Sequence, residues 1–222
     1  MAYRRAGESG ESVVDLAVAE IRQRIRNGDF VPGQRLVAGD LGAELKISGG
    51  PIREALTRLA GEGLIEVQPH RGAVVRTQTK EDIVEIFAIR EVIEGLAARL
   101  AAQAVGTEGM SAREVQQAAD RGREKAKLVD YIGYGLANME FHEAIYALAG
   151  RPRISALARQ LSDQIDRLNN RRLVQVSVLQ RSAAEHDEIL SAILAGNGSL
   201  AEERMRRHVA ASGRKVIGTG DA

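Results

Sequence analysis

Apolar residues recur every three or four positions along most of the chain, which is the spacing of helices with one buried face. The first such helix is expected from Ser12 to Gly28, since glycine commonly follows a helix C-terminus. A short helix is expected over 37–45. The next begins near Ser48, a residue type that caps helices, with Pro51 in its first turn, where a missing N–H costs little. Its predicted buried stripe is Ile52, Ala55, Leu56 and Leu59.

The pattern then changes to two short β-type runs, LIEV at 64–67 and AVVRT at 73–77, joined by the polar segment QPHRG. Such a pair predicts a β-hairpin with a polar tip. Three helices followed by a hairpin are typical of a winged helix-turn-helix, which places its third helix in the DNA major groove.

Beyond residue 79 only helical spacing is found. The fold class expected is mainly α: an N-terminal winged helix-turn-helix of three helices plus a β-hairpin, followed by an all-α six-helix bundle. The last helix is expected to open with a capping box of Ser199 and Glu202. The six expected helices cover about 79–105, 111–127, 129–149, 151–168, 178–195 and 199–215. The expected parts are a disordered N-terminus at 1–11, the winged domain at 12–77, a linker at 78–82, the helical domain at 83–215 and a flexible C-terminus at 216–222.

Composition fits this organisation. Hydrophobic residues make up 44% of the 222 residues but aromatic ones only 3%, so aliphatic side chains must fill the core. The absence of cysteine excludes disulfides and thiolate metal sites and fits a reducing compartment. The near balance of 31 Lys and Arg against 30 Asp and Glu indicates no partner by bulk charge. No apolar run approaches the roughly 20 residues of a membrane span, so a cytoplasmic protein without a membrane partner is expected.

The face of the third helix opposite its buried stripe carries Gly50, Arg53, Glu54 and Thr57. A guanidinium group such as that of Arg53 can bind guanine or a phosphate through two hydrogen bonds. The other interpretation is an ordinary solvated helix face beside a polar turn, and the pattern alone leaves the two open.

A family resemblance favours DNA binding. The segment RLVAGDLGAELKISGGPIREALTRLAGEGLIEVQPHRGAVV resembles the DNA-binding domain of GntR-family bacterial transcription regulators, with the PIREAL run and the HRGAVV wing in order. The family usually has arginine after the serine that starts the third helix, whereas this chain has Gly49, which puts that contact in doubt. The residues expected at DNA are Arg35, Ser48, Gly50, Arg53, Thr57, His70, Arg71 and Gly72.

The remainder resembles the FCD effector domain of the FadR-like branch, on the segments TKEDIVEIFAIREVIEGLAARLAA, NMEFHEAIYALAGRP, AAEHDEILSAI and ERMRRHVAAS. Six helices are closer to the VanR-type subgroup than to the seven-helix FadR type. The resemblance implies a homodimer, assembled through the helical domain, that binds an inverted-repeat operator in double-stranded DNA.

Three of the four histidines, His142, His186 and His208, fall on or beside the inward stripes of three different expected helices, and Asn138 lies one turn before His142. Imidazole nitrogens bind Zn²⁺, Ni²⁺, Fe²⁺ and Mn²⁺. Each histidine alone is more simply a hydrogen-bonded core residue. The resemblance favours a divalent metal, Zn²⁺ first, because many FCD domains hold one with an acid and three histidines. Here Asn138 stands in place of the acid, so weaker binding or a different metal is expected.

Arg90 falls in the inward stripe of its helix. It is expected either to form a structural ion pair with Glu94, one turn on, or to bind a small carboxylate effector beside the metal. The function expected is a ligand-responsive transcription regulator rather than an enzyme. The alternatives are a metal-dependent helical-bundle enzyme with an accessory winged domain, and a winged-helix protein–protein module with a structural metal.

Overall fold

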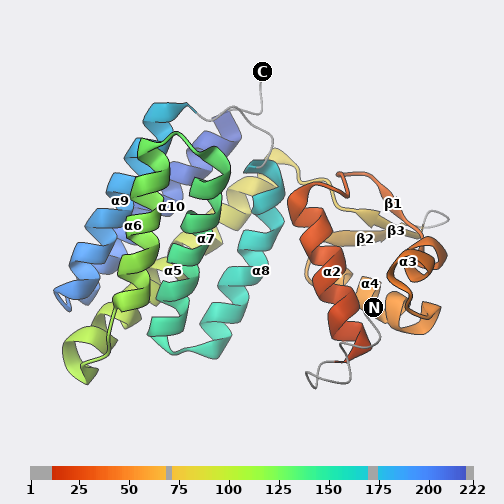
Figure 1. The fold of residues 1–222 in the computed structure, drawn as a ribbon, viewed down its shortest axis with the longest axis horizontal. Helices are drawn as coiled ribbons and strands as arrows, with labels where there is room; N and C mark the ends of the chain where they lie inside the picture. Colours follow the sequence, from red (N-terminus) through yellow and green to blue (C-terminus); the bar gives the residue numbers. More distant parts are fainter. Residues whose placement is uncertain (1–11, 69–71, 170–174, 219–222) are drawn as a thin grey trace. The chain divides into compact units, whose positions relative to one another are not determined.

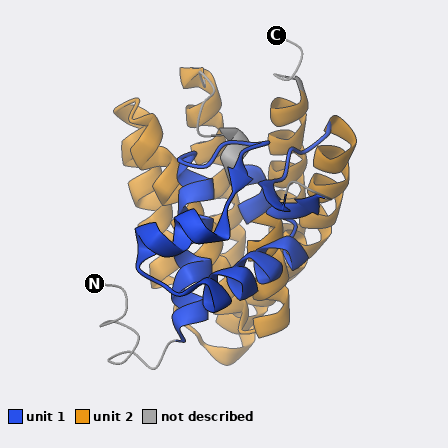
Figure 2. Cartoon of the chain, turned by 90° about the vertical axis from the view of Figure 1, so that its right-hand side faces the viewer, with its two compact units in different colours: residues 1–79, 163–171 blue, residues 80–162, 172–222 orange. Residues whose placement is uncertain are grey.

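The computed structural model describes residues 12–68, 72–169 and 175–218, and within these ranges the chain forms nine helices and three strands (Figure 1). Two compact units are present and are described separately (Figure 2). Unit 1 comprises the described residues up to Thr79 together with residues 163–169 at the end of α8; unit 2 holds the other described residues. No helix in the described ranges is both long enough and apolar enough to cross a membrane.

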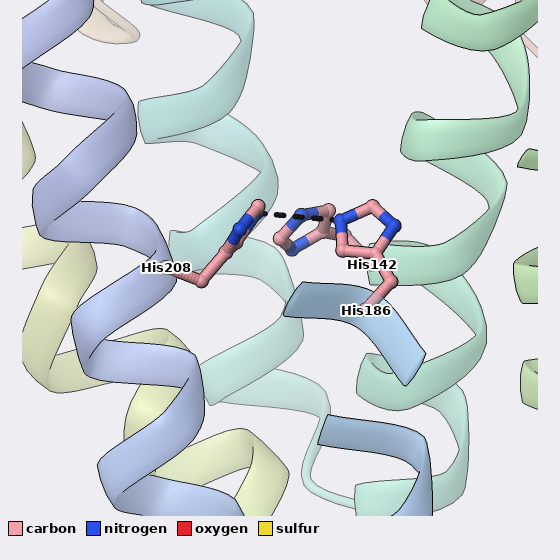
Figure 3. A group of neighbouring side chains, drawn as sticks. All are labelled: His142, His186 and His208. Atoms are coloured by element: carbon pink, nitrogen blue, oxygen red, sulfur yellow. Dashed lines mark hydrogen bonds between the residues drawn. The ribbon is translucent and has the colours of Figure 1, made fainter. Parts of the chain in front are cut away.

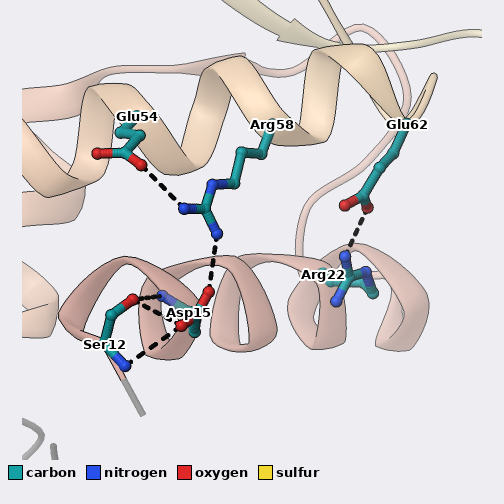
Figure 4. A network of polar contacts seen from close by, with 6 residues as sticks. All are labelled: Ser12, Asp15, Arg22, Glu54, Arg58 and Glu62. Atoms are coloured by element: carbon teal, nitrogen blue, oxygen red, sulfur yellow. Dashed lines mark hydrogen bonds and ion pairs between the residues drawn. The ribbon is translucent and has the colours of Figure 1, made fainter.

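Unit 1 begins with α2, whose two ends are fixed by local sequence. Its N-cap Ser12 forms the reciprocal capping box with Asp15 (Figure 4). Gly28 ends it in the left-handed conformation at φ 80°. Both ends match the expectation from sequence. The elements of unit 1 are α2 Val13–Asn27, β1 Arg35–Leu36, α3 Ala38–Leu45, α4 Gly49–Gly61, β2 Ile65–Gln68 and β3 Gly72–Val75.

A tight turn joins α3 to α4. Lys46 ends α3 at φ 59°, a left-handed conformation that is uncommon outside glycine. Gly42 lies against this turn, and a Cβ there would come within 2.8 Å of the Ile47 carbonyl oxygen, so the approach requires glycine. Ser48 is the N-cap of α4 as expected, although its side chain makes no capping hydrogen bond. The predicted stripe of α4 is buried in the core of this unit.

The small sheet has the order β1-β3-β2, with both pairs antiparallel. The β2–β3 hairpin confirms the predicted wing strands, with Ile65 opposite Val75. The third strand, β1, was not predicted, because its two residues are too few to show alternation. Arg35 pairs with Val74, so β3 lies in the middle of the sheet.

Unit 2 contains five whole helices and the first part of α8, so six helices follow the sheet within the described ranges, which confirms the expected number. The main pairings are α5 with α10 and α6 with α7, while α9 packs against both α6 and α10 (Figure 1). Glycines allow two close approaches: Gly106 meets Gly196, and Gly213 of α10 lies against the Phe87 side chain of α5. The helices are α5 Lys80–Glu108, α6 Arg113–Lys127, α7 Tyr131–Ala149, α8 Pro152–Asn169, α9 Val176–Leu194 and α10 Gly198–Gly218.

The expected capping box at the start of the last helix is wrong. Helix α10 begins at Gly198, so Ser199 lies inside its first turn. The cap comes from Asn197, whose Oδ1 accepts a hydrogen bond from the Leu200 N–H at 3.1 Å. Asparagine accepts that bond as well as serine does, so the helix begins two residues earlier than expected.

Candidate metal centre and nucleic-acid interface

Three helices of unit 2 bring the three predicted histidines together. His142 comes from α7, His186 from α9 and His208 from α10, and each is less than a tenth exposed (Figure 3). One ring nitrogen of each lies within 4.8 Å of the others. Each helix turns its histidine inward because the same face carries aliphatic and small residues that pack in the bundle.

The closest approach in this group has the dimensions of a tetrahedral metal site. Nε2 of His186 and Nε2 of His208 lie 3.3 Å apart (Figure 3). Two nitrogens bound to one tetrahedral Zn²⁺ at about 2.0–2.1 Å lie roughly 3.3–3.4 Å from each other. The spacing therefore suits a shared ion as well as it suits an N–H···N hydrogen bond.

Glu185 determines which ring nitrogen of His208 carries the proton. Its Oε2 lies 2.8 Å from His208 Nδ1, and the hydrogen bond lowers the pKa of Glu185 although burial alone would raise it. Because an ionised carboxylate only accepts hydrogen bonds, Nδ1 carries the proton. The lone pair of His208 is then on Nε2, the atom that faces His186.

The sequence had suggested Glu94 only as a partner for Arg90, yet it also belongs to the histidine cluster. Glu94 is fully buried; its Oε1 lies 2.7 Å from Arg90 Nε and its Oε2 lies 2.8 Å from His142 Nδ1. Neither Oε2 nor Nδ1 has a well-directed hydrogen bond, so two buried polar atoms face each other incompletely satisfied. Burial would raise the pKa of Glu94, but Arg90 and His142 together hold it well below its ordinary value.

Burial and neighbouring charges favour the neutral form of two of the imidazoles, His186 and His208. Burial lowers the pKa of His186 well below its ordinary value, and the neighbouring His208 and His142 lower it further. Burial also lowers the pKa of His208, against the opposing effect of Glu185. Neutral imidazole is the form that binds metals, so the donor set fits a divalent cation of the imidazole-preferring kind.

The two other residues predicted for this site lie on α7 and α5. Asn138 is partly buried on α7, one turn before His142. Arg90 is bound to Glu94, which is one of the two alternatives expected from sequence, and its guanidinium also lies 5.0 Å from the centre of the Phe87 ring. His186 stacks on Phe141, with ring centres 4.1 Å apart.

In unit 1, the predicted DNA-contacting residues of α4 lie on its exposed face. Ser48, Gly50, Arg53 and Thr57 are all exposed, and the Thr57 hydroxyl donates a hydrogen bond to the Arg53 carbonyl at 2.9 Å. At Gly49 an added Cβ would lie 3.1 Å from Arg53 Nη1, so the guanidinium occupies space that a side chain at 49 would take.

The remaining predicted contacts lie in the sheet and wing. Arg35 is exposed on β1, and Gly72 opens β3 at φ 72°. His70 and Arg71 fall at 69–71, outside the residues that the structure describes.

Taken together, a winged helix-turn-helix and a helical bundle with an inward histidine cluster define a two-domain regulator. Residues 14–75 match the model of the bacterial regulatory proteins of the gntR family, and residues 85–211 match the FCD domain. The chain belongs to the GntR family of transcription regulators and carries an FCD domain.

Similar proteins match most of the chain. A Paenarthrobacter nicotinovorans protein named "Probable D-xylose utilization operon transcriptional repressor" is 31% identical over 199 residues, which are 90% of this chain and 84% of that protein. The Escherichia coli HTH-type transcriptional repressor GlaR is 25% identical over 197 residues, 85% of this chain and 89% of GlaR. These relatives are regulators, so the enzyme interpretation is not supported.

Two solved structures have a fold similar to that of this chain. A GntR-type transcriptional regulator from Rhodococcus sp. RHA1 is 26% identical with a TM-score of 0.75, over 92% of this chain and 97% of that one. Escherichia coli McbR/YncC has a TM-score of 0.80 over 94% and 98% of the two chains at 20% identity, a likeness of fold.

Proposed function

We propose that this regulator is a cytoplasmic, homodimeric repressor that binds an inverted-repeat operator and releases it in response to a small carboxylate sensed at a divalent metal in unit 2. The observation that carries the sensing part is the convergence of His142, His186 and His208 from three helices. Repression is favoured because the relatives include repressors.

DNA recognition is assigned to α4 and the wing. Arg53 is the one arginine on the predicted contact face of α4, and it reaches either a guanine edge or a phosphate. Ser48, Gly50 and Thr57 contact the backbone or neighbouring bases around it, while Arg35, His70, Arg71 and Gly72 contact the flanking phosphates. Phosphate contacts fix the register, and Arg53 supplies base recognition.

The metal is held by the three histidines, with the Asn138 carboxamide oxygen as a fourth ligand. Zn²⁺ is the first candidate, and Ni²⁺, Fe²⁺ and Mn²⁺ suit the same donors with more water in the coordination shell. A bound ion supplies positive charge and an open coordination position for an anion.

The effector is a small carboxylate because the site becomes cationic only when metal is present. The charges of Arg90 and Glu94 offset each other, and burial lowers the pKa of His186 and His208, which favours their neutral forms. A dication therefore leaves net positive charge in a buried place, which an organic acid can neutralise. Arg90 binds the second oxygen of that acid, in exchange with Glu94. An effector that binds one arrangement of the dimer better shifts the population towards it.

A second copy of the chain is assigned to the outer face of α5. Val84, Ile89 and Val92 are all more than two-fifths exposed on successive turns of this helix. Exposed apolar side chains gathered in this way mark interaction surfaces.

The deciding experiment is a gel shift of genomic fragments with full-length protein, with and without Zn²⁺ and a panel of organic acids. Retarded fragments sharing an inverted repeat, released by one acid only in the presence of metal, are the expected result. Retardation that no acid affects would remove the sensing role. Absence of any retarded fragment would overturn the assignment to an operator.

A further inference from the structure

Two carboxylates beside the histidine cluster each place an oxygen near Nδ1 of a histidine, and of the two contacts only Glu185–His208 has hydrogen-bond geometry. Glu185 Oε2 is 2.8 Å from Nδ1 of His208, and Glu94 Oε2 is 2.8 Å from Nδ1 of His142. In both rings the carboxylate is at Nδ1, which leaves Nε2 as the available nitrogen. Two such contacts from two different helices, α5 and α9, onto two of the three histidines give this cluster a second layer.

We infer that Glu185 and Glu94 are positioning residues for the metal: they hold the proton on Nδ1 of His208 and His142, direct Nε2 of each ring at the ion, and supply the negative charge that Asn138 lacks. This inference rests on the metal site proposed above. A carboxylate behind a ligating histidine fixes its tautomer and raises its basicity, and losing one typically weakens metal binding about 10–100-fold.

This chain needs negative charge near the ion because Asn138 stands in place of the acidic residue expected there. Three neutral imidazoles and a neutral carboxamide bring no negative charge to a dication, whereas Glu94 and Glu185 each bring one through a histidine. Arg90 offsets part of the charge of Glu94, since its Nε lies 2.7 Å from Oε1. Glu185 therefore contributes the larger effect. His186 is oriented differently, by stacking on Phe141.

The positions of the two residues make them testable. Glu185 is on the surface side of the cluster, with its side chain 19% exposed, so its replacement leaves no charge stranded in the core. Glu188, also on α9, is a matched control: it pairs with Arg204 and Arg207 at the surface. Glu94 is fully buried against Arg90, so Glu94→Gln is paired with the double variant Arg90→Gln/Glu94→Gln, which removes both charges together.

The experiment measures Zn²⁺ affinity of the full-length chain by competition with a chromophoric chelator, the absorption spectrum of the Co²⁺ form, and the melting temperature without metal. Glu185→Ala is expected to raise the Zn²⁺ dissociation constant about 10–100-fold and change the Co²⁺ spectrum. Glu185→Gln, which can still accept a hydrogen bond, should lie between wild type and Glu185→Ala. Glu188→Gln should match the wild type. Both Glu94 variants should bind more weakly than the wild type.

The outcomes separate this inference from the proposed metal site. Wild-type protein that binds neither Zn²⁺ nor Co²⁺ would overturn the site and the inference with it. A wild type that binds metal while Glu185→Ala binds it equally well would overturn the inference alone. So would a Glu185→Ala protein whose metal-free melting temperature falls while its Zn²⁺ affinity stays unchanged, because that result identifies a merely structural residue.

Discussion

Nη1 of Arg58 lies 2.7 Å from Oδ1 of Asp15, so the carboxylate that caps α2 also binds the last turn of α4 (Figure 4). The same guanidinium bonds Glu54 on α4 through Nη2, at 2.9 Å. Arg58 is therefore occupied within unit 1, and Arg53 is the exposed arginine of α4 that we propose contacts DNA. The N-terminus of α2 and the position of α4 are coupled through one carboxylate.

Stability should depend on pH through Asp15. Its pKa is lowered mainly by hydrogen bonds with Ser12, and further by Arg58. A lowered folded-state pKa means that the stabilisation is complete above the unfolded value of about 3.9 and is lost as pH falls through the folded value. The Asp15→Asn variant should melt below the wild type at pH 7, and the difference should shrink below about pH 4. Thermal melts at several pH values check this, and a gap that stays constant down to pH 2.5 (roughly 1.4 units below that value) would contradict it.

Replacing Arg53 by alanine should weaken operator binding by about 1–3 kcal/mol, the usual contribution of one arginine contact to a base edge. Fluorescence anisotropy with a labelled operator measures the change. Arg113→Ala, an exposed arginine at the start of α6, is the matched control and should bind as the wild type does. Equal affinity for Arg53→Ala and Arg113→Ala would show that α4 is not the reading helix.

Metal removal should lower the melting temperature. A ligand that binds only the folded state at a hundred times its dissociation constant adds about 2.7 kcal/mol, or about 5–10 °C for a chain of this size. His186→Ala should abolish both metal binding and the effect of a chelator. Asn138→Asp should tighten binding, because an anionic oxygen replaces a neutral one. The site would be ruled out if a chelator left the melting temperature of the wild type unchanged and elemental analysis found no metal in the protein after loading.

Two glycines of α3 should respond in opposite directions to alanine. Gly42→Ala places a Cβ 2.8 Å from the Ile47 carbonyl oxygen and should destabilise the protein by about 1–3 kcal/mol. Gly39→Ala has no atom within 4 Å of the new Cβ and should stabilise it by about 0.5–1 kcal/mol through helix propensity. Chemical denaturation of the two variants makes the comparison, and equal shifts would mean that the turn after α3 is not tight.

Val92→Glu should convert the dimer to a monomer, because it places a charge on the outer face of α5. Ile132→Glu is the control, since Ile132 is 82% exposed at the start of α7 and lies in a different apolar group. Sedimentation velocity at micromolar concentration distinguishes the species. If Ile132→Glu dissociates the dimer and Val92→Glu does not, the interface lies at the connection between α6 and α7 instead.

The sequence predicted most helices well because caps and apolar stripes are local signals. Strand β1 was not predicted, because its pairing depends on β3, which is distant in sequence. The three histidines were found since each lies on an inward stripe. The contact of Glu94 with His142 could not be found, because spacing within α5 pairs Glu94 with Arg90 and says nothing about which atom of another helix meets its second oxygen. Glu185 adjoins His186 in sequence but bonds His208 in space, which only the packing of α9 on α10 determines.

The meeting of Gly106 and Gly196 has a practical consequence for building a fluorescent biosensor from this chain. An added Cβ at Gly196 would lie 2.9 Å from the Gly106 Cα, so the α9–α10 turn is unsuitable for inserting a reporter domain even though Asn197 beside it is exposed. The connection between α5 and α6 is the better choice: Gly109 has no atom within 4 Å of an added Cβ, and Met110 is 48% exposed. Exposed, loosely packed connections tolerate inserted domains best, and this one follows the helix that carries Arg90 and Glu94.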